Sequence, residues 1–425
     1  MATDTTCSLK IAVVGGPQYD RLYERLALFE QETGHRVEIA FKGSHPELND
    51  YLAATFASYG SSNSHPELDL VSTHIKYAPS QAHFLQELDE TMVTEQERAA
   101  FLPAALEASK IQDRLMQLPR MVDSRVLFYR DDVFERLGLQ PPATWRDLLH
   151  CASTIHRANV PTTTDPKSKV MQGYVFPGKL SGLFGTFYEL ALMEMQQGEA
   201  LFDRKDRPVF EEAVVAEVLR YMRELVSSGA VPQDLEDYYF DEVSALFAEG
   251  KVAMVADWPS FYKEMKRALK HQPGARVKVM QYPVGANRKR SAYSGMHSFA
   301  IPKSCRYPKQ ALQLLKFLVR DDQQWIEASE SGSFPTKKSV LQRLVEETEA
   351  RTRDVGDKDA TLDSERLRCL EATVQHDMAM FPHLISYPEL EDALYLMIQD
   401  AMMGRVTPEK AARSMRVKAM QLAQQ

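Results

Sequence analysis

The sequence predicts an α/β protein made of two discontinuous lobes, and three features of the chain indicate this class. Short apolar runs alternate with helical patterns at the start, a long helical stretch follows, and a second strand-rich piece comes after it. Strands separated by helices of this length form βαβ units with a parallel sheet. At 425 residues the chain also exceeds the ~150 residues typical of one domain.

The first part of the chain supplies the alternation. The apolar runs 9–14, 37–41 and 68–72 are predicted strands, and the patterns at 19–33 and 46–59 are predicted helices. Ligands of open α/β sheets bind outside the carboxyl ends of the strands, so a site is expected where these strands end.

Residues 114–149 contain the most informative stretch. The run 126–129 is a predicted buried strand, and the helix after it is expected to stop at Gly138. Thr144 is expected to cap the next helix, whose first turn holds Asp147. The stretch holds no nucleophile, metal cluster or phosphate loop.

The remaining elements follow the same logic of periodicity and breakers. Predicted helices are 145–158, 185–197, 211–228, 241–249, 308–319, 323–329, 340–352, 388–402 and 408–423; predicted strands are 252–256, 277–282 and 298–301; and 353–363 is expected to be a mobile loop.

Composition excludes several classes of protein. The apolar fraction of 44% and charged fraction of 26% are ordinary for a globular protein, and the net charge of −8 argues against a nucleic-acid partner. No apolar stretch approaches the ~20 residues of a membrane span. The first residues lack the regions of a secretory signal, which leaves open a processed exported chain and a cytosolic protein.

Motifs for chemistry are sparse. Gly15 and Gly16 follow the first strand without the spacing of a dinucleotide site, which leaves a plain turn or a turn that admits a ligand. The P-loop, H-E-x-x-H and G-x-S-x-G motifs are absent, and the histidines are dispersed. Tyr238 and Tyr239 are expected to pack or lie at the surface, with ferric-ion ligation as the alternative. The four cysteines lack metal-site spacing, and both free thiols and long-range disulfides stay open.

Segments along the whole chain resemble extracellular solute-binding proteins of sugar ABC transporters, the maltose-binding-like cluster. They include LDLVSTHIKYAPSQAHFLQELDE, LMQLPRMVDSRVLFYRDDVFERLGLQPPATW, FAEGKVAMVADWPSFY, SGSFPTKKSVL and GRVTPEKAARSM. The resemblance implies a fold of the periplasmic binding protein type II kind, with two α/β lobes joined by a hinge and a ligand cleft between them. The implied lobes are 1–119 with 259–322 and 120–258 with 323–425, with hinge crossings near 119–123, 256–260 and 320–326.

The resemblance also implies ligand contacts at strand ends, at the lobe crossing and in late loops. These residues are Gly16, Gln18, Tyr19, Lys42, His45, Thr73, His74, Arg120, Asp123, Trp258, Gly295, Met296 and Lys337. Trp258 follows a strand and would stack on a sugar ring, with a core tryptophan as the alternative. A turn at 293–298 would present the backbone of Gly295 and Met296, and Lys337 would be a basic contact.

By resemblance the protein captures a carbohydrate and delivers it to a membrane permease, acting as a monomer outside the cytoplasm, without cofactor, metal, nucleic acid or catalytic residues. The sequence departs from many relatives, which have an acidic residue at the position of His74 and arginine at that of Lys337. The resulting basic lining favours an acidic or modified sugar or polyol. A cytosolic or chemosensory sensor stays an alternative. A carbohydrate-active enzyme is disfavoured, because paired carboxylates or an activated nucleophile cannot be assembled.

Overall fold

The computed structural model of the protein describes residues 6–58, 67–161, 170–194, 201–203, 207–272, 274–353, 357–380 and 384–423; the side chains of residues 17, 18, 181, 194 and 358 are outside this description. The chain forms two compact units. Unit 1 comprises Met1–Asp123 and Gly295–Glu346, and unit 2 comprises Ser124–Ser294 and Glu347–Gln425. Each unit is therefore built from separate stretches of the chain.

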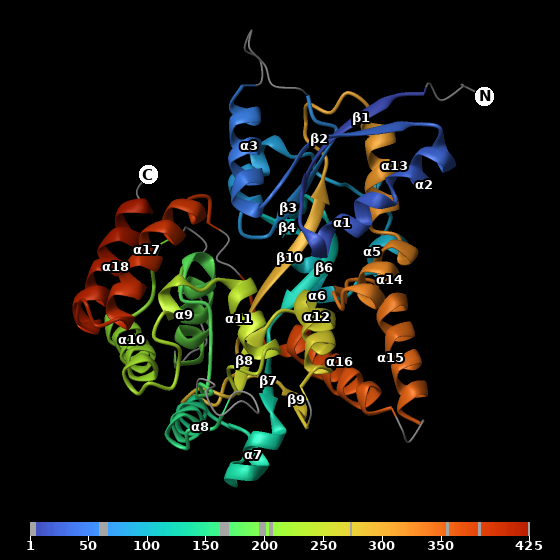
Figure 1. Ribbon diagram of the computed structural model, residues 1–425. Helices are drawn as coiled ribbons and strands as arrows, with labels where there is room; N and C mark the ends of the chain where they lie inside the picture. Colours follow the sequence, from blue (N-terminus) through green and yellow to red (C-terminus); the bar gives the residue numbers. More distant parts are fainter. Residues whose placement is uncertain are drawn as a thin grey trace. The chain divides into compact units, whose positions relative to one another are not determined.

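Unit 1 is organised around a mixed sheet (Figure 1). Its strands are β1 (Ser8–Val14), β2 (Arg36–Gly43), β3 (Leu70–His74), β6 (Leu118–Ser124), β10 (Ala292–Ala300) and β11 (Phe334–Pro335), in the order β11-β6-β10-β3-β1-β2, with a separate hairpin of β4 (Lys110–Ile111) and β5 (Arg114–Leu115). β1 runs parallel to β2 and β3, whereas β10 runs antiparallel to β3. The carboxyl ends of β1, β2 and β3 therefore share one edge of the sheet.

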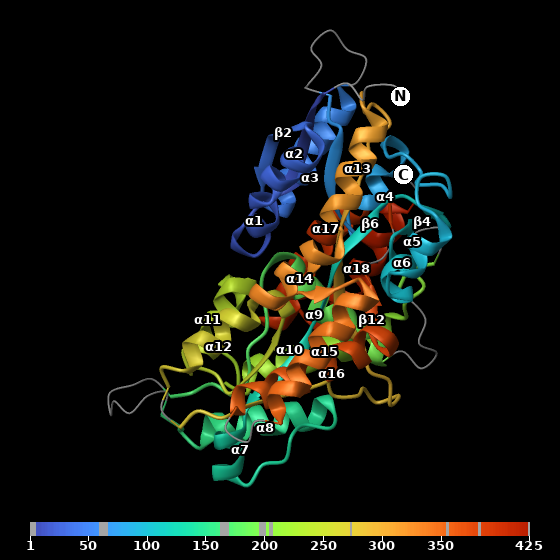
Figure 2. The ribbon, with the colours of Figure 1, turned by 90° about the vertical axis from the view of Figure 1, so that its right-hand side faces the viewer.

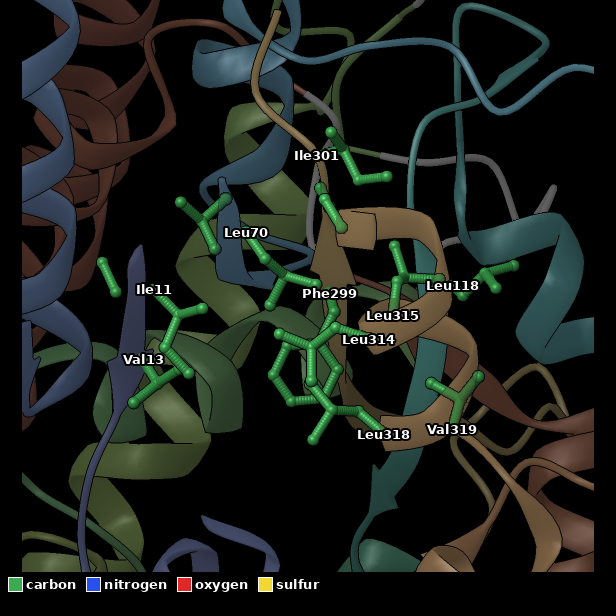
Figure 3. Packing of buried hydrophobic residues seen from close by; sticks show 14 of the residues in the cluster. Ile11, Val13, Leu70, Leu118, Phe299, Ile301, Leu314, Leu315, Leu318 and Val319 are labelled. Carbon is green, nitrogen blue, oxygen red and sulfur yellow. The ribbon is translucent and has the colours of Figure 1, made fainter. Parts of the chain in front are cut away.

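Helices cover this sheet. They are α1 (Pro17–Glu24), α2 (Leu26–Thr33), α3 (His45–Ala57), α4 (Ala78–Gln81), the short η1 (Ala82–Phe84), α5 (Glu95–Ala99), α6 (Pro103–Ala108), α13 (Pro308–Leu318) and α14 (Asp321–Glu330). In the core of unit 1, Leu314, Leu315 and Leu318 of α13 pack beside Phe299 of β10 (Figure 3). Their spacing along α13 places them on one face of the helix, which anchors it to the sheet.

Unit 2 combines a small antiparallel sheet with a helical layer. The strands of this sheet are β7 (Val126–Arg130), β8 (Met254–Asp257) and β9 (Val277–Met280), whereas β12 (Met378–Met380) pairs in parallel with the first residues of β10. The helices of unit 2 are α7 (Asp131–Leu137), α8 (Trp145–Arg157), α9 (Leu180–Glu194), α10 (Glu212–Ser227), α11 (Phe240–Ala248), α12 (Tyr262–Leu269), α16 (Lys358–His376), α17 (Tyr387–Met402) and α18 (Pro408–Leu422), with short η2 (Leu235–Asp237) and η3 (Pro259–Phe261). The helix α15 (Lys338–Thr352) spans the boundary at residue 346. The sheet has the order β8-β7-β9, and α9, α10, α17 and α18 pack together (Figure 2).

The units divide at positions that differ from the predicted lobes. Residues 259–294 were expected in the N-terminal lobe but belong to unit 2, because β9 pairs with β7 and α12 packs against α11. Residues 323–346 were expected in the C-terminal lobe but belong to unit 1, where α14 packs against β11. The first boundary, after Asp123, lies next to the predicted crossing at 119–123.

Local expectations had mixed outcomes. Gly138 ends α7 in the left-handed region and Thr144 caps α8, as predicted. The expected turn at 293–298 is wrong, because these residues lie inside the buried strand β10. The predicted helix 19–33 is two helices separated at Arg25.

The predicted loop at 353–363 is also wrong over its second half, where α16 begins at Lys358 behind the cap of Asp357; residues 354–356 lie outside the description. Buried Ala360, Leu367 and Leu370 recur at helical spacing along α16. This helical spacing indicates a helix in the sequence, but the charged residues at the start of the segment favoured a loop.

Among the described residues, none of Cys7, Cys151, Cys305 and Cys369 forms a disulfide with another. Within the described ranges, no helix combines the length and apolar character needed to cross a membrane.

Candidate functional site

The strand ends of unit 1 carry the polar side chains that form the candidate site. Gly16 follows β1 and begins α1 with a φ of 135°, a conformation that favours glycine. His45 is the first residue of α3, directly after Ser44, which forms a capping box with Glu47. His74 is the last residue of β3. The α/β topology therefore brings three successive strand ends to one place.

Three histidines form the centre of this site, and we call His45, His74 and His297 the histidine cluster. His297 lies in β10 directly opposite His74 in the strand register. The ring centroids lie 5.0 Å apart for His45 and His74, 4.9 Å for His45 and His297, and 5.0 Å for His74 and His297. Residues dispersed along the sequence thus meet through sheet pairing.

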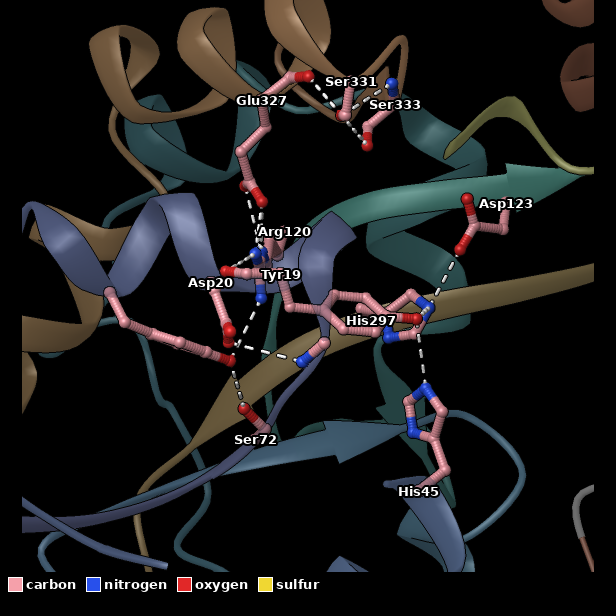
Figure 4. A network of polar contacts seen from close by, with 12 residues as sticks. Tyr19, Asp20, His45, Ser72, Arg120, Asp123, His297, Glu327, Ser331 and Ser333 are labelled. Carbon is pink, nitrogen blue, oxygen red and sulfur yellow. Dashed lines mark hydrogen bonds and ion pairs between the residues drawn. The ribbon is translucent and has the colours of Figure 1, made fainter. Parts of the chain in front are cut away.

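Tyr19 and Asp123 connect to the cluster through hydrogen bonds (Figure 4). The Tyr19 hydroxyl lies 3.2 Å from His45 Nε2 and 3.4 Å from His297 Nε2. Asp123 Oδ2 lies 2.8 Å from His297 Nε2. Among the described residues, Asp123 Oδ1 and His297 Nδ1 are buried without a hydrogen-bond partner. Such atoms are costly unless a further group satisfies them.

Arg120 is buried beside the site but is fully engaged. Its guanidinium forms an ion pair with Glu327 of α14, at 2.8 Å from Nε to Oε1, and donates to the Tyr23 hydroxyl and the Tyr19 carbonyl. It also lies over the ring of Tyr19 at 5.5 Å. Burial alone would lower the pKa of Arg120, but Glu327 and the tyrosines raise it above its usual value. Arg120 therefore holds α1, β6 and α14 together as a permanent cation.

The electrostatic environment keeps two histidines of the cluster neutral. Burial lowers the pKa of His45 well below its usual value, and the positive groups His297, Lys76 and Arg120 lower it further. Burial, His297, His45 and Lys76 do the same to the pKa of His74. At neutral pH these imidazoles can each donate and accept one hydrogen bond, as polyhydroxylated ligands require.

Other predicted residues of unit 1 are engaged elsewhere or lie beside the cluster. Lys42 is exposed and its ammonium lies 3.2 Å from Asp20. Thr73 donates to Gln117, and the Met296 carbonyl accepts from Ile75 at 3.1 Å. Lys337 lies 3.7 Å above the ring of Phe101.

Two further predicted residues complete unit 1. Gly295 lies in β10, between the residues paired with β12 and those paired with β3. The side chain of Gln18 lies outside the description, although its backbone belongs to α1. The basic set expected from the sequence therefore does not converge, because Arg120 and Lys42 are paired and Lys337 lies on an aromatic ring.

Trp258 belongs to unit 2, where it follows β8 and begins η3. The guanidinium of Arg125 lies over its ring at 5.4 Å, and the ring of Phe240 meets it edge-on. Trp258 is 8% exposed, so most of its surface packs against protein. Its role as a sugar platform stays a prediction.

Within the described part of the chain, no group of three or more His, Cys, Asp or Glu has a metal-holding arrangement. Tyr239, the alternative iron ligand, packs its ring against Phe240 at 4.2 Å.

Sequence reasoning missed four residues of the site: His297, Lys76, Glu327 and Tyr23. His297 directly follows Met296 in the segment 293–298, so its position in the sequence is a signal for its place in the site. Glu327 reaches Arg120 from another part of the chain, and no local pattern indicates that pairing.

Comparisons with known proteins agree with this architecture. Residues 24–354 match the family described as bacterial extracellular solute-binding protein. A probable ABC transporter-binding protein of Deinococcus radiodurans is 25% identical over 59% of this chain and 58% of its own length. The arabinooligosaccharide-binding protein of Bacillus subtilis is 22% identical over 54% of this chain and 50% of its own. The chain thus spans only about half the length of these two relatives.

Solved structures show the same fold. Maltose-bound MalE3 of T. maritima superimposes with a TM-score of 0.78 at 21% identity, covering 98% of this chain and 100% of that one. A solute-binding protein of Agrobacterium radiobacter in complex with ribitol has a TM-score of 0.74 at 20% identity, with 98% of each chain covered. The family match extends over most of the chain, and the fold agrees with it over nearly the full length. The chain belongs to the bacterial extracellular solute-binding proteins, as the resemblance in its sequence predicted.

Proposed function

We propose that this protein captures a carbohydrate or sugar derivative outside the cytoplasm and delivers it, chemically unchanged, to the permease of an ABC transporter. The observation that carries the proposal is the set of hydrogen-bonding groups at the strand ends of unit 1. Tyr19, the histidine cluster and Asp123 offer hydroxyl, imidazole and carboxylate groups within a few ångströms of one another. Ligand hydroxyls need this mixture of donors and acceptors.

Relatives support the carbohydrate class. One relative is named for arabinooligosaccharides, and similar folds have been solved with maltose and with ribitol bound. Capture without chemistry agrees with the arrangement of the site. Glu327 is held in an ion pair by Arg120, so it is not available to Asp123 as the partner in an acid–base pair. We propose that the protein acts as a monomer and that Trp258 contributes an aromatic contact.

A thermal-shift screen tests this proposal. Neutral mono- and oligosaccharides, polyols, sugar acids and sugar phosphates would be added to the full chain, and hits confirmed by calorimetry. A ligand present at 100 times its Kd stabilises the folded protein by about 2.7 kcal/mol, which raises the unfolding midpoint by several degrees. We expect at least one member of these classes to bind. Amino acids, peptides and metal ions are the comparison set, and binding confined to that set would contradict the proposal.

A further inference from the structure

Buried polar atoms without a hydrogen-bond partner among the described residues lie within and beside the histidine cluster. Three imidazoles from α3, β3 and β10 lie with ring centroids about 5 Å apart. His297 is 4% exposed and Asp123 is 6% exposed, and each has a buried polar atom without a partner among the described residues. Buried unpaired atoms of this kind indicate a place where a ligand completes the hydrogen bonding.

Negative and positive side chains act on different members of the histidine cluster. Asp123 Oδ2 lies 2.8 Å from His297 Nε2. Lys76 is 6% exposed, and its positive charge acts on both His45 and His74. Arg120 also acts on His45, although Glu327 pairs with it. The elements that meet near the cluster carry further charged and titratable side chains. They are Tyr19 and Asp20 of α1, Lys42 of β2, Lys76 and Tyr77 after β3, Arg120 and Asp123 of β6, and Glu327 of α14; Asp20 pairs with Lys42, and Glu327 pairs with Arg120.

Lys76 and His297 act on both His45 and His74 as positive charges do, because each of them lowers the pKa of these two imidazoles beyond the effect of burial. A neutral ligand leaves this positive potential unbalanced when the histidines gain protons. An anionic ligand group would remove the repulsion, and each protonated imidazole would then donate a charge-assisted hydrogen bond.

We infer that His45 and His74 receive an acidic group of the ligand, which binds together with protons taken up from water, while Asp123 accepts a hydroxyl of the same ligand. This inference rests on the proposed function and specifies the ligand as an acidic sugar derivative. The acidic group is a sugar carboxylate or a sugar phosphate, since both present oxygen acceptors to imidazolium. No covalent bond changes; the ligand anion and the protons move together from solvent to the site.

Proton uptake fixes how affinity depends on pH. The ligand raises the pKa of His45 and His74, so the complex binds more protons than the free protein and binding tightens as pH falls. Each proton taken up contributes up to about tenfold in affinity per pH unit. A neutral sugar has no such gain, because protonation removes an acceptor nitrogen from each imidazole.

Calorimetry on the full chain tests this inference. D-glucuronate, D-galacturonate, D-gluconate and D-glucose 6-phosphate would be compared with D-glucose, D-galactose and sorbitol at about pH 7.5 and about pH 5.5, a range that spans histidine titration. We expect an acidic member to bind at least about tenfold tighter at the lower pH and to outbind its neutral counterpart. Repeating the titration in buffers of different ionisation enthalpy measures the protons taken up. Carboxylates and phosphates are separated by which of them binds.

Variants connect the effect to the cluster. His45→Gln and His74→Gln should each reduce proton uptake and flatten the pH dependence of affinity, because glutamine keeps a donor and an acceptor but cannot be protonated. His83→Gln is the matched control, since His83 is an exposed histidine of the same unit. Circular dichroism and the unfolding midpoint establish that each variant is folded.

The possible results of these experiments test the inference and the proposed function separately. Neutral sugars that bind as tightly as the acids, or acids whose affinity does not rise at lower pH, overturn the inference and leave the proposed function intact. If no carbohydrate of either kind binds, the proposed function fails in that assay. The histidine resonances then decide the inference in the unliganded protein. Inorganic phosphate or acetate should raise the pKa of His45 and His74, and an unchanged pKa overturns the inference.

Discussion

Arg120 and Arg125 lie close together in the sequence but belong to different units, and their comparison shows how each unit treats a buried charge. Both are almost fully buried, both pair with a glutamate from a helix, and both lie among aromatic rings. Arg120 uses all three of its nitrogens, whereas Arg125 Nε has no partner among the described residues. In unit 1, therefore, all three nitrogens of the buried arginine are hydrogen-bonded, whereas polar atoms of the neighbouring histidine cluster lack a partner among the described residues.

The glutamate partners differ as well. Burial raises the pKa of Glu189 to about 7 although Arg125 lies beside it. Glu327 instead meets Arg120 with both carboxylate oxygens. The carboxylate of Glu327 thus meets its arginine through two oxygens, whereas Glu189 is only partly ionised near pH 7 and balances the permanent cation of Arg125 in part. Four predictions test and sharpen this contrast.

The largest effect is expected from removing the glutamate charges. Glu327→Gln should destabilise unit 1 by about 3–5 kcal/mol, because it leaves the buried guanidinium of Arg120 without a countercharge. Glu189→Gln should cost less at pH 7, about 1–3 kcal/mol, because Glu189 is already partly protonated. Urea unfolding of both variants measures the difference.

The pH dependence provides the control for that pair. The folded pKa of Glu189, about 7, lies above its ordinary value of 4.5, so the wild-type protein loses stability from this group as pH rises from 4.5 to about 7. Glu189→Gln should lack this loss. Equal costs for the two variants at pH 7 would show that both pairs are ion pairs.

The second effect concerns the aromatic partner of Arg125. Trp258→Leu should destabilise unit 2 by about 3 kcal/mol, since it removes a buried ring and its contact with the guanidinium. Under the proposed function it should also weaken carbohydrate binding measured by calorimetry. Trp325→Leu is the matched control, because Trp325 is a half-buried tryptophan of unit 1 covered by Arg343 at 3.6 Å. A Trp258 variant that binds ligand normally would assign this ring to the core alone.

The third effect concerns the histidine cluster, whose charge should change with pH, whereas the fully hydrogen-bonded Arg120 beside it stays a cation. The folded pKa values of His45 and His74 lie below the ordinary 6.5, so the stability that they contribute is present above pH 6.5 and is lost as pH falls below it. Each histidine should change the free energy of unfolding by up to about 1.4 kcal/mol per pH unit in that window. The double variant His45→Gln/His74→Gln should have a flatter profile between about pH 6.5 and about pH 5 in urea unfolding. His83→Gln should keep the wild-type slope, and an unchanged slope in the double variant would contradict the depressed pKa values.

Much of this architecture is readable from the sequence because its signals are local. The strand β1, the Gly138 stop and the Thr144 cap follow from residue types at short spacing. Tyr19, His45 and His74 were predicted together because each follows a strand end, and the structure brings their rings close to one another, while their role in binding stays a prediction. It was incomplete where long-range pairing decides, because the register of β10 against β3 brings His297 to His74. Arg120 and Lys42, two members of the predicted basic lining, form ion pairs with acidic side chains. Those acidic partners could not be identified from the local sequence pattern.

The smallest effect compares two helix caps, one in each unit. Thr144 Oγ1 accepts from Asp147 N at 3.1 Å and caps α8, so Thr144→Ala should cost unit 2 about 1 kcal/mol without changing ligand affinity. Ser44 caps α3 together with Glu47, whose carboxylate accepts from Ser44 Oγ at 2.7 Å, and the next residue is His45. Ser44→Ala should cost a similar amount in urea unfolding and should in addition weaken ligand binding, because fraying at the start of α3 displaces His45 from Tyr19. If the two variants changed affinity equally, the cap of α3 would be a stabilising feature of the helix and the position of His45 would be fixed by the cluster itself.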